Sequence, residues 1–279
     1  MIRVYDGSNQ GSIISSFEAH ANIINRIKQS PFNNQYVATC SDDKTVKIWD
    51  SSDGTLLQEY TNHANHVNDM EWIYEDTLAS CSDDNTIQLW SANTSQQIQT
   101  INVGLNVISL KLIKNKNYLA AGMVNGNISV YRLNYGFLSF AFSLTGHTAR
   151  VNDLILINES LLASSSDDTS IRIWDLTLNK EKFILNGHSS SVFGLKLVSS
   201  FILASGSADT YIKLWNTTSG TLLNALADHT SEILWSLDSY QNLLVSGSRD
   251  QTIKITDWTT GVCLNTFETG LDISSLVLI

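Results

Sequence analysis

A segment of thirteen residues returns along the chain at intervals of about 41 residues, and this repeat constrains the fold more than any other feature. Its first copy, residues 38–50, reads ATCSDDKTVKIWD, with two aspartates in the middle and Trp-Asp at the end. Further copies occupy residues 79–91, 163–175, 204–216 and 245–257, and a weaker copy occupies 120–132. A period of this length is typical of a protein in which one supersecondary unit is repeated.

Each repeat contains four short β-rich segments separated by Asp, Asn, Ser and Gly; in the fourth repeat these span residues 151–157, 161–166, 170–174 and 182–185. Such runs indicate short strands joined by tight turns. Five of the six histidines keep the same period, with spacings of 43, 84, 41 and 41 residues, and the double spacing falls on the weak repeat. Four strands per period, with Gly-His and Trp-Asp marks, predict the blades of a propeller.

These marks, in register over nearly the whole chain, resemble the WD40-repeat family. The resemblance implies an all-β fold, a seven-bladed β-propeller with four-stranded antiparallel blades, formed as one domain by residues 1–279. Six full repeats run from about residue 23 to residue 267. The family resemblance predicts the fold far more specifically than the function.

Both termini are expected to share the seventh, closing blade. Residues 2–6 match a third strand, residues 13–17 a fourth strand and residues 272–278 a first strand. Pairing of the two ends would remove exposed sheet edges that invite aggregation. The blade lacks a second strand, which leaves two interpretations: an incomplete closing blade, or a chain that is a fragment of a longer one. We favour the fragment, because a strand between the first and third is hard to omit without losing ladder hydrogen bonds.

In the family that the chain resembles, a His, a Ser or Thr, an Asp and a Trp in each blade form a buried hydrogen-bond network. The hydroxyl could come from either of two positions, such as Ser164 or Ser166. Because this set recurs in each strong repeat, we do not expect it to be a Ser-His-Asp catalytic site, which would occur once. The candidate network residues are His20, Asp43 and Trp49; His63, Asp84 and Trp90; His147, Asp168 and Trp174; His188, Asp209 and Trp215; and His229 with Asp250.

Two repeats depart from this pattern. The sixth has Thr256 where Trp is expected, and Trp258 falls two positions later. The third has lost the whole set, because it carries Val103, Ala121, Met123, Asn125 and Tyr131 at the network positions. We expect these two blades to be the least rigid.

Composition argues against several other functions. The formal charge of −10 makes a nucleic-acid binder improbable, since such proteins usually carry a basic patch. No apolar run reaches the roughly 20 residues that a membrane span needs, and we expect an intracellular protein of the cytoplasm, the nucleus or both. The three cysteines do not suggest a disulfide framework. His63 and His66 lack the further ligands of a metal site, and no motif predicts a cofactor.

In the resembled family, partners usually bind the face formed by the turns between second and third strands and by the loops that lead into the first strands. We call this the top face. Three aspartates at a narrow channel mouth would focus negative potential, so we expect either a basic peptide segment with an apolar neighbour, or aspartates that merely form turns. The candidate partner-binding residues are Asp42, Asp83, Asp167, His66, Arg150, Phe193, Leu234, Arg249, Asn25, Asn68 and Asn152.

The function expected from these observations is that of a non-catalytic interaction scaffold, a monomeric propeller within a complex of other proteins. The alternative is a targeting or substrate-recognition module of a larger multidomain regulator, such as a ubiquitin-ligase adaptor or a signalling protein.

Overall fold

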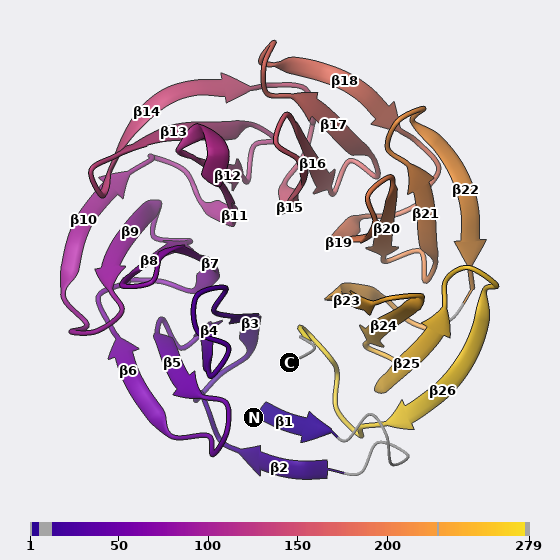
Figure 1. Ribbon diagram of the computed structural model, residues 1–279, viewed down its shortest axis with the longest axis horizontal. Helices are drawn as coiled ribbons and strands as arrows, with labels where there is room; N and C mark the ends of the chain where they lie inside the picture. Colours follow the sequence, from indigo (N-terminus) through magenta and orange to yellow (C-terminus); the bar gives the residue numbers. More distant parts are fainter. Residues whose placement is uncertain (1, 6–12, 228, 277–279) are drawn as a thin grey trace.

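The computed structural model describes residues 2–5, 13–227 and 229–276, without the side chains of residues 3–5, 13–15, 234 and 235. Six four-stranded sheets stand as blades around a central axis, and the first strand of each lies innermost (Figure 1). Within a blade the strands pair antiparallel in chain order, so that each blade is a meander. One 3-10 turn, η1 (Lys114–Lys116), joins the first two strands of blade 3.

Blade 1 comprises β3 (Ile24–Gln29), β4 (Tyr36–Ser41), β5 (Val46–Asp50) and β6 (Leu56–Tyr60). Blade 2 comprises β7 (Val67–Tyr74), β8 (Thr77–Ser82), β9 (Thr86–Ser91) and β10 (Gln97–Asn102). Blade 3 comprises β11 (Val107–Ile113), β12 (Tyr118–Met123), β13 (Ile128–Asn134) and β14 (Phe137–Leu144). Blade 4 comprises β15 (Val151–Asn158), β16 (Leu161–Ser166), β17 (Ile171–Asp175) and β18 (Lys180–Leu185). Blade 5 comprises β19 (Val192–Ser199), β20 (Ile202–Ser207), β21 (Ile212–Asn216) and β22 (Thr221–Leu226). Blade 6 comprises β23 (Ile233–Tyr240), β24 (Leu243–Ser248), β25 (Thr252–Asp257) and β26 (Val262–Glu268).

The repeated Asp builds the turn between the second and third strands. In blade 1 the residue after it, Lys44, has a φ of 73°, which a side chain with a Cβ adopts only at a cost. The Asp43 carboxylate compensates by accepting the backbone N–H of Thr45 at 3.0 Å, an Asx turn. Blade 3 uses Asn125 and Gly126 at the same two positions. The repeated acidic pair therefore has a local structural reason before any function is considered.

The apolar core is divided into clusters that lie between neighbouring blades. Between blades 1 and 2, for example, Val46 and Ile48 pack with Met70 and Trp72, all at most 3% exposed. Similar clusters join blades 2 and 3, 3 and 4, 4 and 5, and 5 and 6. Blades 2 to 5 thus bury both of their faces against their neighbours.

The prediction of seven blades was wrong, because the described residues form six four-stranded blades. As predicted, residues of the N-terminal region form two strands, β1 (Ile2–Tyr5) and β2 (Ile13–Phe17), which pair antiparallel in a two-stranded sheet. The expected first strand at residues 272–278 is not formed over its described part, 272–276, and residues 277–279 lie outside the described residues. In a meander the first strand pairs only with the second, and no segment of the described chain supplies that second strand.

Residues 271–276 nevertheless connect blade 6 to blade 1. Ile273 packs against Gly247, where a Cβ would lie 2.3 Å from its side chain, and its backbone carbonyl accepts the Ser236 hydroxyl at 2.8 Å. On the other side, the Ser274 hydroxyl donates to the carbonyl of Ile24 at 2.6 Å, and Ser275 accepts the N–H of Ile27 at 3.3 Å. Serine hydroxyls bridge this seam in place of a strand ladder.

Candidate functional site

A chain of short hydrogen bonds runs through blade 4, joining the repeated polar residues. His147 Nδ1 lies 2.7 Å from Asp168 Oδ2, His147 Nε2 lies 2.7 Å from Ser164 Oγ, and Trp174 Nε1 donates to the same hydroxyl at 2.8 Å. Blades 1, 2 and 5 repeat these contacts at 2.7–2.9 Å through Thr39, Ser80 and Ser205. In blade 6, His229 contacts Asp250 at 2.9 Å and Ser246 at 2.8 Å.

The donor and acceptor capacities of the four groups determine the direction of these hydrogen bonds. The indole N–H can only donate and the ionised carboxylate can only accept. The hydroxyl therefore accepts from Trp174 and donates to His147 Nε2, and Nδ1–H donates to Asp168. This arrangement needs a neutral imidazole, and burial lowers the pKa of His147 below its ordinary value although Asp168 opposes the shift. Burial lowers the pKa of His20, His63 and His188 in the same way.

The network hydroxyls have no exposure to solvent, since Ser80, Ser164, Ser205 and Ser246 are all 0% exposed. A substrate could not reach them, so the arrangement fits a structural role and gives no support to nucleophilic catalysis. The second hydroxyl of each repeat has a different contact: Ser166 Oγ, for example, accepts the N–H of Asp168 at 3.1 Å. The structure thus places the first of the two candidate hydroxyls in the network and the second in the turn.

Blades 3 and 6 replace the missing contacts differently. In blade 3 the buried Tyr131 ring lies edge-on to Phe140 at 6.0 Å, within the apolar cluster shared with blade 2. In blade 6 the Trp258 indole N–H donates to the carbonyl of Gln241, in the turn between β23 and β24, at 3.1 Å. Their lower rigidity stays a prediction.

At the top face, one backbone hydrogen bond recurs in all six blades and joins the two kinds of loop that carry the candidate binding positions. The residue before the turn Asp or its equivalent donates its N–H to the carbonyl just before the first strand, at 2.9–3.1 Å. The bonded pairs are Asp42–Ile23, Asp83–His66, Val124–Asn106, Asp167–Arg150, Ala208–Ser191 and Arg249–Glu232. This rim has a constant backbone and variable side chains.

Three asparagines of the predicted set link neighbouring blades. Asn68 Nδ2 donates to Asp83 Oδ1 at 2.8 Å and to the carbonyl of Val107, in the next blade, at 2.9 Å. Asn25 and Asn152 make the same pair of bonds, to Asp42 and Val67 and to Asp167 and Val192. The three aspartates are therefore already hydrogen-bonded within the propeller, a role that neither sequence-based interpretation anticipated.

The remaining predicted residues are spread around the rim. His66 is half exposed, with Nδ1 3.5 Å from Asp42 Oδ1, and it is separate from the buried His63. Arg249 forms an ion pair with Glu232 at 2.8 Å on the surface. The carbonyl of Phe193 accepts the hydroxyl of Ser165 at 2.8 Å. The side chain of Leu234 lies outside the described residues.

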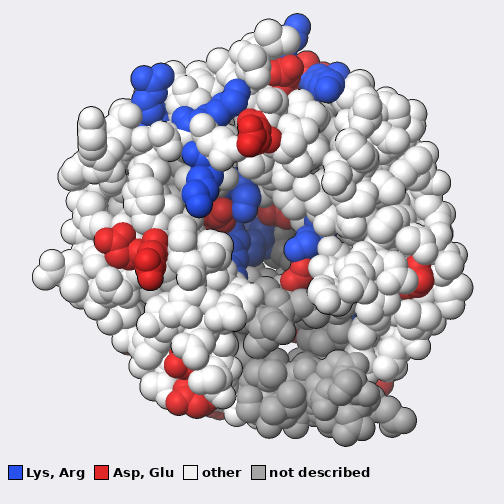
Figure 2. Space-filling view, in the orientation of Figure 1, with Lys and Arg blue, Asp and Glu red and all other residues white. Residues whose placement is uncertain are grey.

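Charged side chains of both signs gather at the central hollow of the ring (Figure 2). They come from the innermost strands, a position that the sequence analysis did not single out. Lys28 contacts Asp69 at 2.8 Å and Glu71 at 3.0 Å, and Lys111 contacts Glu71 at 2.8 Å. On blade 5, Lys196 pairs with Asp238 of blade 6. The sequence signal that could have revealed these charged residues is the alternation of charged and apolar residues in a first strand, as in Arg26-Ile27-Lys28.

Arg26 crosses the hollow from blade 1 to blade 4. Its Nη2 donates to the carbonyl of Asn152 at 3.1 Å, and its guanidinium lies 3.8 Å from Asp69 and 3.7 Å from Asp153. Burial raises the pKa of Asp153, although Arg26 opposes this shift. The ring interior is thus partly closed by an ion-pair network instead of being an open acidic channel.

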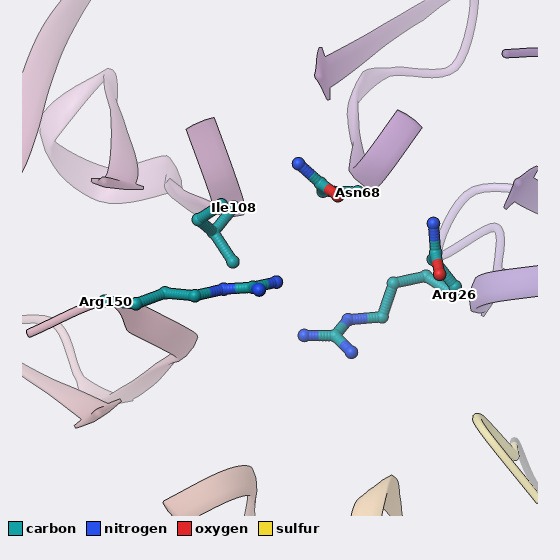
Figure 3. A pocket seen from close by; sticks show the side chains of 5 residues that line it. Arg26, Asn68, Ile108 and Arg150 are labelled. Atoms are coloured by element: carbon teal, nitrogen blue, oxygen red, sulfur yellow. The ribbon is translucent and has the colours of Figure 1, made fainter. Parts of the chain in front are cut away.

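Beside Arg26 lies a small pocket lined by Asn25, Arg26, Asn68, Ile108 and Arg150, which we call the channel-mouth pocket. It encloses about 210 Å³ of empty space, part of it open to solvent. The guanidinium groups of Arg150 and Arg26 point toward each other across it (Figure 3). One of its lining residues, Arg26, was not among the predicted site residues.

Among the described residues, no three His, Cys, Asp or Glu side chains are grouped so that they could hold a metal ion. The described part of the chain also has no helix that is long and apolar enough to cross a membrane.

The chain is similar to known proteins over its repeats. It spans half or less of the length of several curated relatives. These include the serine-threonine kinase receptor-associated protein of Gallus gallus (28% identity over 64% of this chain and 50% of the relative) and the histone acetyltransferase type B subunit 2 of Debaryomyces hansenii (28%, 61% and 46%). They also include the nuclear distribution protein PAC1-2 of Uncinocarpus reesii (36%, 60% and 39%).

The family model described as "WD domain, G-beta repeat" matches residues 11–50, 54–91, 138–175, 179–216 and 220–257, which together are more than half of the chain. No match falls on residues 92–137, the region of blade 3 that lacks the polar network. With its four-stranded blades and recurring His, Asp and Trp contacts, the chain belongs to the WD40-repeat family of β-propellers.

Proposed function

We propose that the chain is a non-catalytic protein-interaction scaffold that presents its top face to peptide or protein partners. The observation that carries the proposal is the rim of six equivalent backbone hydrogen bonds, which fixes loops from all six blades at one end of the ring. A rigid backbone that displays different side chains at equivalent positions is suited to specific binding. The names of two relatives, a receptor-associated protein and an acetyltransferase subunit, agree with this role.

An apolar part of the rim offers a contact surface. Leu105 and Val124 of blade 3 are 41% and 40% exposed, and the N–H of Val124 donates to the carbonyl of Asn106, next to Leu105, at 3.1 Å. Exposed apolar side chains surrounded by polar groups favour contact with a partner. Blade 3, which lacks the polar network, thus brings apolar side chains to the mouth of the ring.

A basic peptide at the three top-face aspartates stays a prediction, and the contacts support it less than we expected. Each aspartate already accepts an asparagine N–H, and two arginines line the adjoining pocket. An incoming Lys or Arg would meet their positive charge.

Affinity purification with mass spectrometry tests the proposal. Partners captured by the wild-type chain should be lost in a variant that carries Leu105→Ser and Val124→Ser. The matched control carries Phe201→Ser and Tyr240→Ser, because these side chains are 64% and 63% exposed at the opposite end of the blades. Loss of partners from the control variant alone would place binding on the opposite face and contradict the proposal.

We also infer an intracellular location, in the cytoplasm, the nucleus or both, since one relative is named a U3 small nucleolar RNA-associated protein. Imaging of a fluorescent fusion in cells tests this inference.

A further inference from the structure

Arg150 differs from the other cations around the central hollow because its side chain has no hydrogen bond or ion pair with any described residue. Its Nε is buried without a partner. Lys28, Lys111 and Lys196 each contact a carboxylate, and Arg26 is held by the carbonyl of Asn152 and by the carboxylates of Asp69 and Asp153. A guanidinium stays charged at neutral pH, and burying it without a counter-charge costs free energy. Among the described residues, Arg150 therefore presents a guanidinium without a direct carboxylate partner at the channel mouth.

The surroundings of Arg150 favour an anion and disfavour a cation. Burial lowers the pKa of the Arg150 guanidinium; Asp167 and Asp83 oppose the shift, and the nearby charge of Arg26 adds to it. Neither carboxylate forms an ion pair with the Arg150 guanidinium, and both already accept an asparagine N–H. The two guanidinium groups face each other across the pocket (Figure 3), and an anion between them would be attracted by both.

The pocket also limits the size and charge of the anion. Asn25 and Asn68 use both of their N–H groups on the turn aspartate and on a backbone carbonyl, so they offer no further donor. The guanidinium groups are the remaining donors, and only one of them lacks a partner. A carboxylate carries a single charge and matches the planar fork of one guanidinium. Ile108, which is 3% exposed, provides an apolar wall for the methylene groups that carry such a carboxylate.

We propose that the channel-mouth pocket binds an Asp or Glu side chain of a partner protein, with Arg150 forming a bidentate ion pair to its carboxylate. The inference rests on the proposed scaffold function and names the chemistry of the partner. The backbone at Arg150 is already fixed, because its carbonyl accepts the N–H of Asp167 at 3.0 Å. The exposed Leu105 and Val124 lie on the neighbouring part of the rim, so an acidic residue close to an apolar one is the expected recognition pattern.

The probe is a phage-displayed library of random heptapeptides, selected on the purified wild-type chain. We expect enrichment of Asp or Glu at one position of the selected peptides. For a selected synthetic peptide, Arg150→Ala should weaken the affinity about 10- to 100-fold, the range for a hydrogen-bonded charge, and replacing the acidic residue by Gln should have a similar effect. The matched control is Arg249→Ala, which removes a top-face arginine that is already paired with Glu232 and should leave the affinity unchanged.

Circular dichroism and thermal unfolding of both variants exclude a loss of fold as the cause. The proposal is overturned if the library yields no binders, if the selected peptides are basic or neutral, or if Arg150→Ala and Arg249→Ala weaken binding equally. A phosphoserine peptide that binds more tightly than its Glu counterpart would show that the pocket prefers a phosphate to a singly charged carboxylate, and would also overturn the proposal. If the Leu105/Val124 variant still loses its partners, the scaffold function stands without the acidic recognition.

Discussion

Replacing Thr39 by Ala should destabilise the propeller by about 2–4 kcal/mol more than replacing it by Ser. The Thr39 hydroxyl joins two buried groups of blade 1: His20 Nε2 lies 2.7 Å from it and Trp49 Nε1 donates to it at 2.8 Å. Thr39 itself is 0% exposed. Alanine leaves both ring nitrogens without a partner in a site that water does not reach.

The magnitude follows from the two orphaned groups. A buried donor or acceptor that loses its partner costs about 1–3 kcal/mol, and part of the sum is offset because a buried hydroxyl is removed. Thr39→Ser is the matched control, since it keeps the hydroxyl and deletes only the methyl group, at a cost of about 1 kcal/mol. With an unfolding entropy of about 2.1 cal/mol/K per residue, the difference between the variants corresponds to about 3–7 °C in Tm for a chain of 279 residues.

Equilibrium urea denaturation followed by circular dichroism, together with calorimetry, measures the difference. A second comparison uses Trp49→Phe, which removes the indole donor. In that background Thr39→Ala should cost about 1 kcal/mol less, because only His20 is left without its partner. Equal destabilisation by Thr39→Ala and Thr39→Ser would refute the reasoning, because the hydroxyl bonds would then contribute nothing to stability.

Three further predictions concern pH, local stability and thiol reactivity. Burial lowers the folded-state pKa of the network histidines, so the unfolded chain takes up protons first as the pH falls, and stability that is present above about pH 6.5 should be lost below it. Glu71, whose pKa the lysines lower to about 2 against the effect of burial, should extend the loss below about pH 4.5. Urea midpoints that do not change between pH 8 and pH 5 would contradict the histidine expectation, and midpoints that do not change between about pH 4.5 and pH 2 would contradict the Glu71 expectation. Amide hydrogen exchange should be faster in blade 3, which lacks the polar network, than in blade 4, and equal protection would show that the apolar contacts compensate fully. A thiol-alkylating reagent should label the exposed Cys263 in the native protein but Cys40 and Cys81 only after unfolding. The reason is that Cys40 and Cys81 are buried, and burial raises the pKa of both thiols. Mass spectrometry of native and denatured samples measures the labelling of each cysteine, and labelling of Cys40 or Cys81 in the native protein would contradict the prediction.

The acidic top face shows how a sequence pattern can be misleading. From the sequence, Asp42, Asp83 and Asp167 are three carboxylates at the mouth of a ring. In the structure they accept hydrogen bonds from asparagines that also reach the neighbouring blade. The backbone carbonyl that each Asn bonds in the next blade is 39–42 residues away in sequence, so that only the packing of blade against blade brings these two groups together.

The sequence by itself determined the blade. Its period of about 41 residues predicts four strands, and the His, Asp and Trp positions of each strong repeat lie where the short hydrogen bonds are found, because these contacts form within one repeat and its adjoining loop. The tertiary structure decided the number of complete blades in the described chain, which is six, and the seam, where the hydroxyls of Ser236, Ser274 and Ser275 bond residues 271–276 to blades 6 and 1. It also decided the charge at the channel mouth, where Arg26 reaches across to blade 4 and the side chain of Arg150 has no partner among the described residues. Such contacts join side chains from different repeats, and their distances depend on how the whole ring closes, which no local pattern encodes.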